Sequence, residues 1–137
     1  MAHGISILLW IRLAHIRRKY EHAATEQLRP WDLSLAQFDV LTTLVASEGI
    51  TQLDLATQLL VTQGNITQLL TKLEQRGLIT RHQEGRTKCL KLTGQGRQLL
   101  DVVMPAHATW NAEQFAGLSH EEQRQLLALL RKLDHTM

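Results

Sequence analysis

The sequence predicts a mainly α-helical protein with one small β-hairpin, and three observations lead to this fold class. Residues 51–60 and 61–74 form two short amphipathic segments in direct succession. Residues 78–92 alternate between apolar and polar side chains around Glu84-Gly85, as the two strands of a hairpin would. Apolar residues at helical spacing run through both ends of the chain. This order is that of a winged helix-turn-helix between terminal helices, so we expect one domain over residues 1–137.

The positive charge of the chain is concentrated in its middle. The 137 residues have a formal net charge of +2, and 44% are hydrophobic and 20% charged, as in an ordinary folded domain. Residues 51–97 hold seven basic and three acidic side chains, whereas residues 30–50 hold three acidic and no basic ones. A positive field over the helix-turn-helix segment favours a polyanionic partner.

One cysteine and one apolar stretch bear on the compartment. Cys89 is the single cysteine, which excludes an internal disulfide and fits a reducing environment. The apolar stretch Ile5–Ile11 has seven residues and no basic residue before it, so it is too short for a membrane span and a poor signal peptide. We therefore expect a cytoplasmic protein with no membrane partner.

Local signals place the ends of the helices. A first helix should end near Arg29-Pro30, because proline cannot continue a helix. Ser34 and Gln37 have the spacing of a capping box, so a second helix should begin at Ser34 and stop near Glu48-Gly49. A kink or break is expected at Pro105. Further helix starts are predicted at Thr51, Thr93 and Ser119.

The chain divides into a central lobe and two terminal segments. Residues 34–92 form the winged helix-turn-helix lobe, and residues 1–33 and 93–137 form the terminal helices. These helices carry more leucine and isoleucine than one thin chain can bury, which favours a homodimer. The alternative is that they pack only on their own domain.

The second helix of the motif has one apolar and one uncharged polar face. The apolar positions, which should face the core, are Ile66, Leu69, Leu70 and Leu73. The opposite face carries amides and hydroxyls that can contact base edges, and a lysine suited to phosphate. The alternative is an ordinary solvated face. The residues expected to contact duplex DNA are Gln63, Gly64, Asn65, Thr67, Gln68, Thr71 and Lys72.

The hairpin adds a cationic ribbon next to this helix. If Glu84-Gly85 forms a two-residue turn, Arg81 lies directly opposite Lys88. Two cations in that arrangement destabilise an isolated hairpin, and a nearby phosphate backbone would relieve the cost. We expect Arg81, Arg86 and Lys88 to contact phosphates or the minor groove, provided that this register holds.

Three blocks of the sequence resemble the MarR family of transcription regulators. They are Ser34-Leu-Ala-Gln-Phe-Asp-Val-Leu, Leu73-Glu-Gln-Arg-Gly-Leu-Ile and Leu90-Lys-Leu-Thr-Gly-Gln-Gly. The resemblance implies a dimer whose two recognition helices enter successive major grooves while the wings reach the flanking minor grooves. It also implies that Arg86 corresponds to the arginine of the family's Asp-x-Arg wing motif. The wing here is shorter than is usual in the family.

This resemblance implies a homodimeric repressor of a pseudo-palindromic operator. Many relatives leave DNA when a small aromatic or phenolic acid binds between the dimer helices and the DNA-binding lobe. Trp10, His15 and Arg97 have suitable chemistry for such an effector. The alternative for Trp10 is a place in the core or in the dimer contact.

Other functions are weighed against this one. Redox regulation would use Cys89, whose expected strand partner is Thr80, with no histidine placed to activate it. His15 and His22 share a helix face but lack further ligands, so we expect no metal and no cofactor. The sequence has no nucleophile–base pattern and no phosphate loop, which argues against an enzyme. The main rival is a protein-interaction module that uses the same winged surface.

Overall fold

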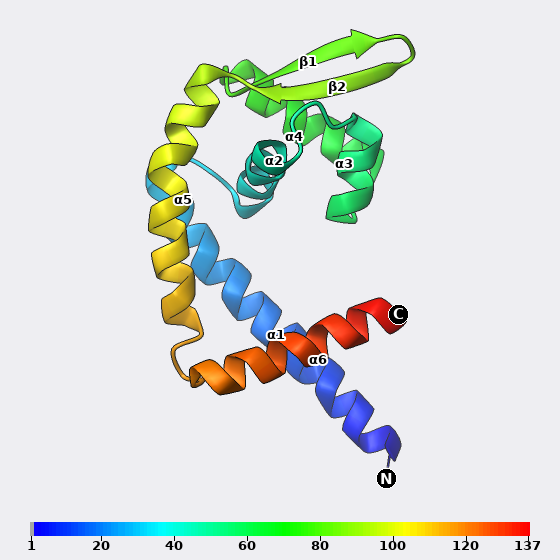
Figure 1. Cartoon of the computed structure of the whole chain (residues 1–137), viewed down its shortest axis with the longest axis vertical. Coiled ribbons are helices and arrows are strands. Elements are labelled where there is room, and N and C mark those ends of the chain that lie inside the picture. The colour runs from blue at the N-terminus through cyan, green and yellow to red at the C-terminus, as the bar shows by residue number, and fades with distance from the viewer. Residues whose placement is uncertain (1) are drawn as a thin grey trace.

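The predicted order of elements is present in the computed structural model, which describes residues 2–137 except for the side chains of residues 2, 3 and 63. A single 3-10 turn is added to that order. The elements are α1 (Ala2–Leu28), η1 (Arg29–Trp31), α2 (Leu35–Ala46), α3 (Gln52–Leu59), α4 (Gln63–Gln75), β1 (Ile79–Glu84), β2 (Thr87–Leu92), α5 (Gly94–Gln114) and α6 (His120–Thr136). The lobe from α2 to β2 lies at one end of the molecule, and α1 and α5 extend from it (Figure 1).

The helix starts lie where the capping signals predicted them. Ser34 Oγ accepts a hydrogen bond from Gln37 N at 3.0 Å, and Ser34 N donates to Gln37 Oε1 at 3.1 Å. The side chains of Thr51, Thr93 and Ser119 each accept a hydrogen bond from the backbone N–H three residues on. Each bond satisfies a backbone donor that the first helical turn leaves unpaired, so these ends are fixed locally.

The core of the lobe is built around α2, which packs against α1, α3, α4, α5 and β2. Its Val40, Leu41 and Leu44 are fully buried. Leu55 of α3 and Leu90 of β2 are fully buried in the same cluster. This shared core holds α3, α4 and the hairpin in fixed positions on one scaffold.

The hairpin is present, but the predicted register is wrong by two residues. Arg81 lies opposite Leu90 and Gln83 opposite Lys88, while Gly85 and Arg86 form the loop. Gly85 is the first loop residue and has a φ of 62°, a conformation that glycine adopts without strain. The prediction placed this glycine second in the loop. Because side chains alternate with a period of two, each strand still presents the same residues to the core.

A kink or break was predicted at Pro105, and no break is found, because α5 runs without interruption from Gly94 to Gln114. Tertiary contacts hold the helix on both sides of the proline. Before it, Leu100 and Val103 are buried in the core. After it, Asn111 Oδ1 accepts a hydrogen bond of 2.6 Å from Tyr20 Oη. The stability that these contacts provide outweighs the loss of the one backbone hydrogen bond that Pro105 cannot donate.

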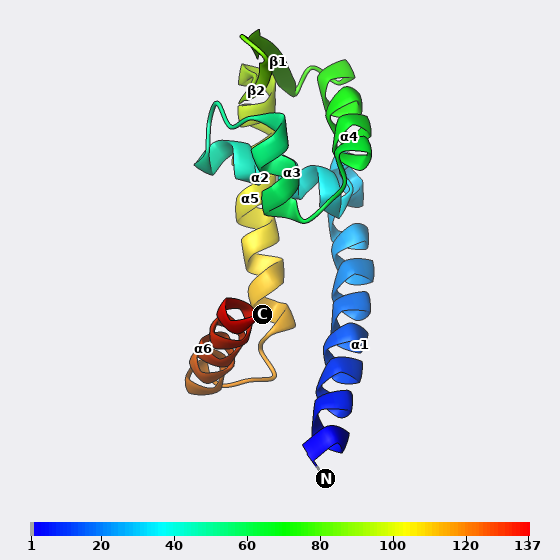
Figure 2. The ribbon, with the colours of Figure 1, turned by 90° about the vertical axis from the view of Figure 1, so that its right-hand side faces the viewer.

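The outer parts of α1 and α6 are largely uncovered by the rest of the described chain. No residue of α6 is buried, and the apolar side chains from Ile5 to Ile11 of α1 are all exposed. The two helices cross in Figure 1, but the view turned by 90° in Figure 2 shows them well apart. Within residues 2–137, no helix is both long and apolar enough to pass through a membrane.

Candidate nucleic-acid interface

Helix α4 has the two faces that the sequence predicted. Thr62 caps its start by accepting a hydrogen bond of 3.2 Å from Asn65 N. Ile66, Leu70 and Leu73 are fully buried, and Leu69 is partly buried against the same core. The opposite face, which we call the reading surface, consists of the exposed Gly64, Asn65, Thr67, Gln68 and Lys72 and the half-buried Thr71. The side chain of Gln63, which was predicted to join them, lies outside the described residues.

Gly64 is not required by the packing of the chain itself. A Cβ built at this position meets none of the described heavy atoms within 4 Å. Gly64 also lies in the first turn of α4, where alanine would favour the helix more. No packing contact within the described chain therefore requires glycine at this position. Without a side chain here, the backbone of α4 can be approached closely from outside the protein.

Arg81 is not the freely presented cation that the sequence suggested. Its Nη2 donates to Glu74 Oε1 at 2.9 Å and to Thr71 Oγ1 at 3.3 Å, both on α4. The side chain of Arg81 is only 16% exposed, against 41% for Glu74. The hydrogen bond from Arg81 lowers the pKa of Glu74, so the pair is charged at neutral pH. Arg81 thus ties β1 to the recognition helix.

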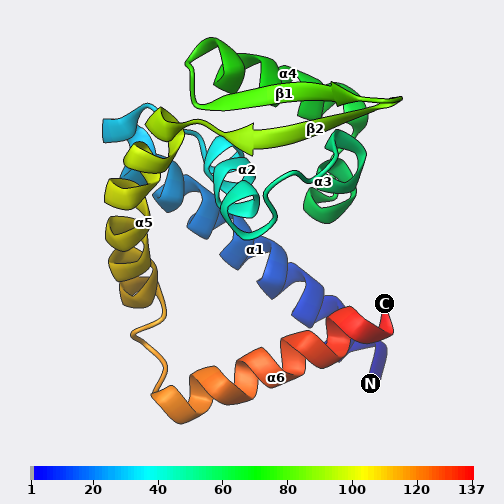
Figure 3. The same cartoon turned by 45° about the horizontal axis from the view of Figure 1, so that its top comes forward.

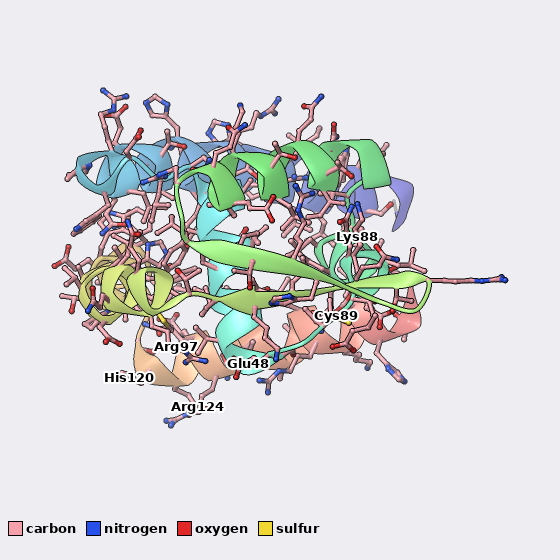
Figure 4. All side chains as sticks on the ribbon, turned by 90° about the horizontal axis from the view of Figure 1, so that it is seen from above. Glu48, Lys88, Cys89, Arg97, His120 and Arg124 are labelled. Carbon is pink, nitrogen blue, oxygen red and sulfur yellow. The ribbon has the colours of Figure 1, made fainter. Side chains whose placement is uncertain are left out.

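The wing presents its other two predicted cations to solvent. Arg86 lies in the loop and Lys88 near the start of β2, and both are exposed. Seen from above in Figure 4, the hairpin runs alongside α4, with Lys88 and Cys89 labelled on it. A groove of about 370 Å³ separates the wing from the first turn of α3. Its lining residues are Thr51, Gln52, Leu53, Gln83, Arg86, Thr87 and Lys88.

The strand partner of Cys89 is His82, so the prediction of Thr80 is wrong. The Cys89 thiol is buried and donates to Glu84 Oε2 at 3.6 Å. His82 Nε2 is 3.2 Å from Thr80 Oγ1. Burial limits the access of an oxidant to this sulfur. Among the described residues, no group of three His, Cys, Asp or Glu side chains could hold a metal ion.

The three residues predicted to bind an effector are not brought together in the chain. Trp10 lines a shallow groove on α1 that neither His15 nor Arg97 lines. Arg97 lies in the first turn of α5, where its Nη2 is 3.2 Å from Glu48 Oε1. Figure 4 shows Arg97 and Glu48 side by side beneath the hairpin.

An aromatic cluster at the junction of α1, α2 and α5 was missed in the sequence. The ring centroid of His107 lies 4.5 Å from that of Phe38 and 5.2 Å from that of Trp110, which lies 5.4 Å from that of Tyr20, and all three pairs are tilted. His107 Nδ1 donates to Gln27 Oε1 at 2.8 Å. His107 and Trp110 are three residues apart on one face of α5, and this spacing could have revealed the cluster.

Burial perturbs the titratable groups at this junction. It lowers the pKa of His107 and raises the pKa values of Tyr20 and Asp39 from their ordinary values. The negative charge of Glu21 adds to the effect on Asp39, and that of Asp39 to the effect on Tyr20. All three pKa shifts therefore favour the neutral form of the side chain at this junction between the terminal helices and the lobe.

Comparisons with known proteins agree with this geometry. The family model described as "MarR family" matches residues 33–85. An uncharacterized HTH-type transcriptional regulator from Bacillus cereus is 37% identical over 130 residues, which cover 94% of this chain and 88% of the relative. The transcriptional regulator HosA from Escherichia coli O157:H7 is 29% identical over 85% of this chain and 88% of its own.

Two solved structures with bound DNA share the fold over most of their length. A MarR mutant from E. coli complexed with operator DNA superimposes with a TM-score of 0.85 at 28% identity, covering 93% of this chain and 95% of that one. The MepR–DNA complex from S. aureus gives a TM-score of 0.80 at 29% identity, covering 94% and 95%. The chain therefore belongs to the MarR family and is a DNA-binding transcriptional regulator of the winged helix-turn-helix class.

Proposed function

We propose that the chain acts as a homodimer that binds a pseudo-palindromic operator and represses transcription by occupying it. The observation that carries this proposal is the side-by-side arrangement of the reading surface and the wing. The reading surface offers uncharged amides and hydroxyls next to Lys72, and the neighbouring wing exposes Arg86 and Lys88. Figure 3 shows α4 and the hairpin next to each other at the end of the lobe remote from α6.

Each part of this surface suits one part of a duplex. Asn65 and Gln68 carry donor–acceptor pairs that match adenine edges in the major groove, and the methyl group of Thr67 can rest on thymine. Lys72 has the charge for a phosphate. Arg86, at the tip of the wing, has the charge and reach for the minor groove.

The terminal helices supply the argument for two copies. Residues Ile7, Leu8, Leu9, Trp10 and Ile11 follow one another, so α1 is apolar on every side near its start. A helix that is apolar all round is stable in water only when it is surrounded. The exposed apolar face of α6, with Leu126, Leu127 and Leu130, lines a groove of about 370 Å³ that a helix of a second copy would cover.

The junction of α1, α2 and α5 is the place for a small aromatic or phenolic effector. It joins the terminal helices to the lobe, so a ligand bound there would shift the two recognition helices relative to each other. Tyr20, Phe38, His107 and Trp110 supply aromatic faces, and Gln27 and Asn111 supply polar groups. Trp10, His15 and Arg97, the effector contacts expected from the sequence, lie outside this aromatic cluster.

Selection of bound duplexes from a random library, followed by salt titration, tests the proposed function. The selected duplex should bind at least about a thousandfold more tightly than a scrambled one. Its affinity should fall steeply with salt, because neutralised phosphates release counterions. No preference among duplexes, or binding that salt leaves unchanged, would favour the protein-interaction module instead.

A further inference from the structure

A side chain of α3 reaches across to the reading surface of α4. Gln52 is the first residue of α3, directly after the capping Thr51. Its Nε2 donates a hydrogen bond of 2.8 Å to Thr67 Oγ1, fifteen residues later in the chain. Thr67 is exposed on the reading surface, whereas Gln52 is half-buried between the two helices. The contact therefore joins a supporting side chain to one that faces outward.

The other polar atom of the Gln52 side-chain amide is buried and unsatisfied within the described chain. Gln52 Oε1 is buried and has no hydrogen-bond partner among the described protein groups. A buried acceptor without a donor costs stability, whereas an apolar side chain of the same shape would not. Folding alone thus does not explain glutamine at this position, and the bond to Thr67 is what the amide provides.

That bond helps to set the direction of the methyl group of Thr67. A threonine in a helix divides its population between two χ1 rotamers, which point Oγ1 and the methyl group in different directions. Oγ1 and the methyl group share one tetrahedral carbon, so holding Oγ1 toward Gln52 also fixes the methyl group. A fixed methyl group can discriminate thymine from other bases, whereas one divided between two directions discriminates less well.

We infer that Gln52 is a specificity-determining positioning residue, which acts on base choice through Thr67 without reading a base itself. This inference rests on the proposed sequence-specific binding of duplex DNA. It assigns one base position in each half-site to the Gln52–Thr67 pair. Both side chains would have to be intact for full discrimination at that position.

The test uses variants of both partners in the full-length protein. Gln52→Met keeps the length of the side chain and removes the donor, and Thr67→Ser keeps the hydroxyl and removes the methyl group. Gln58→Met is the matched control, because Gln58 is an exposed glutamine of the same helix that lines a different groove. Base preference is measured for each purified variant by selection from duplexes randomised at every position.

Gln52→Met and Thr67→Ser should each lower discrimination roughly two- to tenfold at the same single position of each half-site. The double variant should lose no more than Thr67→Ser alone, as expected when both changes act through one methyl group. The melting temperature of Gln52→Met should equal or exceed that of the wild type, whereas a purely structural role would lower it. Gln58→Met should keep the wild-type preference.

An unchanged preference in Gln52→Met, or losses at a different position from Thr67→Ser, would overturn the inference while the proposed function stands. Additive losses in the double variant would overturn it too. A wild-type protein that shows no base preference at all would instead refute the proposed function. The two failures are therefore distinguishable in one experiment.

Discussion

At the scale of a residue, the contacts of Arg81 indicate a different role from the one that its charge alone suggests. In the sequence it is one of the three hairpin cations predicted to contact phosphates or the minor groove. In the structure its guanidinium lies between Glu74 and Thr71 of α4. Because the side chain is only 16% exposed, little of this guanidinium is accessible to a phosphate. We therefore assign Arg81 to positioning the wing against the recognition helix.

Arg81→Met should weaken DNA binding without changing its dependence on salt. Loss of the tie to Glu74 should reduce affinity about tenfold, the cost of a hydrogen bond between charged groups. Because no phosphate contact is lost, the slope of log K against log salt should stay at the wild-type value. Fluorescence anisotropy over a range of KCl concentrations measures both quantities.

Lys88→Met is the matched control for Arg81, since Lys88 is an exposed cation of the same hairpin. It should reduce the magnitude of the salt slope by about 0.9, the value for one lost phosphate contact. If Arg81→Met reduces the slope by the same amount, Arg81 contacts DNA directly and the positioning role is wrong.

At the scale of elements, the joint between the wing and α5 depends on one close approach. A Cβ built on Gly96 lies 2.3 Å from Leu78 O, closer than any real contact of this kind. Gly94, two residues earlier in the same helix, would meet no described heavy atom within 4 Å. The two glycines therefore differ in function although both lie in the first turn of α5.

Gly96→Ala should destabilise the fold by about 1–3 kcal/mol, the usual cost of overpacking. Gly94→Ala should be neutral or stabilise by up to about 1 kcal/mol, because alanine favours the helix and loses less chain entropy. Urea unfolding of both variants measures the difference. Equal free energies of unfolding would show that the joint between Leu78 and α5 is looser than described.

The junction of α1, α2 and α5 should make stability depend on pH through His107. Because burial lowers the pKa of His107, the folded protein resists a proton that the unfolded chain accepts below the ordinary value of 6.5. This contribution to stability is complete above pH 6.5 and is lost as the pH falls toward the lowered pKa. Protonation also brings a positive charge between the rings of Phe38 and Trp110.

His107→Phe should remove this part of the pH dependence while keeping a ring in the cluster. The melting temperature of the wild type should fall more than that of the variant between pH 7.5 and pH 5. Asp39 and Tyr20 are present in both proteins, so their titration cancels in the comparison. Parallel melting curves over this range would mean that His107 titrates freely in the folded protein.

Local elements were predicted from the sequence, and distant contacts were not. The caps at Ser34, Thr51 and Ser119 depend on residues within one helical turn, and all three are confirmed. The hairpin register was wrong because Gly85 can occupy either position of a two-residue loop, depending on the turn type. The sequence around the turn does not distinguish the two.

The contacts that give the candidate site its shape join residues far apart in the chain. Tyr20 and Asn111 are separated by 91 positions, and Gln27 and His107 by 80. The faces of α4 were correct because helical periodicity determines them. The role of Arg81 and the aromatic cluster depended on how helices pack against one another, which periodicity does not specify.

At the scale of the whole molecule, exposed apolar surface concentrates on the terminal helices. Leu8 of α1 is 65% exposed and Leu129 of α6 is 65% exposed. Surfaces of this kind on a folded chain usually mark an interface. The lobe, in contrast, buries most of its leucines, with Leu53 and Leu60 as exposed exceptions, so the need for a partner lies in α1 and α6.

A single charge on this surface should separate the proposed dimer. Leu130→Glu would bury an unpaired carboxylate in the interface, so sedimentation should show monomers at micromolar concentration where the wild type is dimeric. Leu60→Glu is the control, since Leu60 is 91% exposed at the end of α3 and belongs to the lobe rather than to a terminal helix. A variant Leu130→Glu that sediments like the wild type would refute this interface.

The spacing of half-sites tests the central claim most directly, namely that two joined copies present their α4 helices to successive major grooves. Selected duplexes should contain two inverted half-sites with centres about 10 base pairs, or about 34 Å, apart. Inserting five base pairs between them rotates one half-site to the opposite side of the duplex, and affinity should then fall to the level of a scrambled sequence. Equal affinity for the original and the expanded site, or for a single half-site, would contradict the claim.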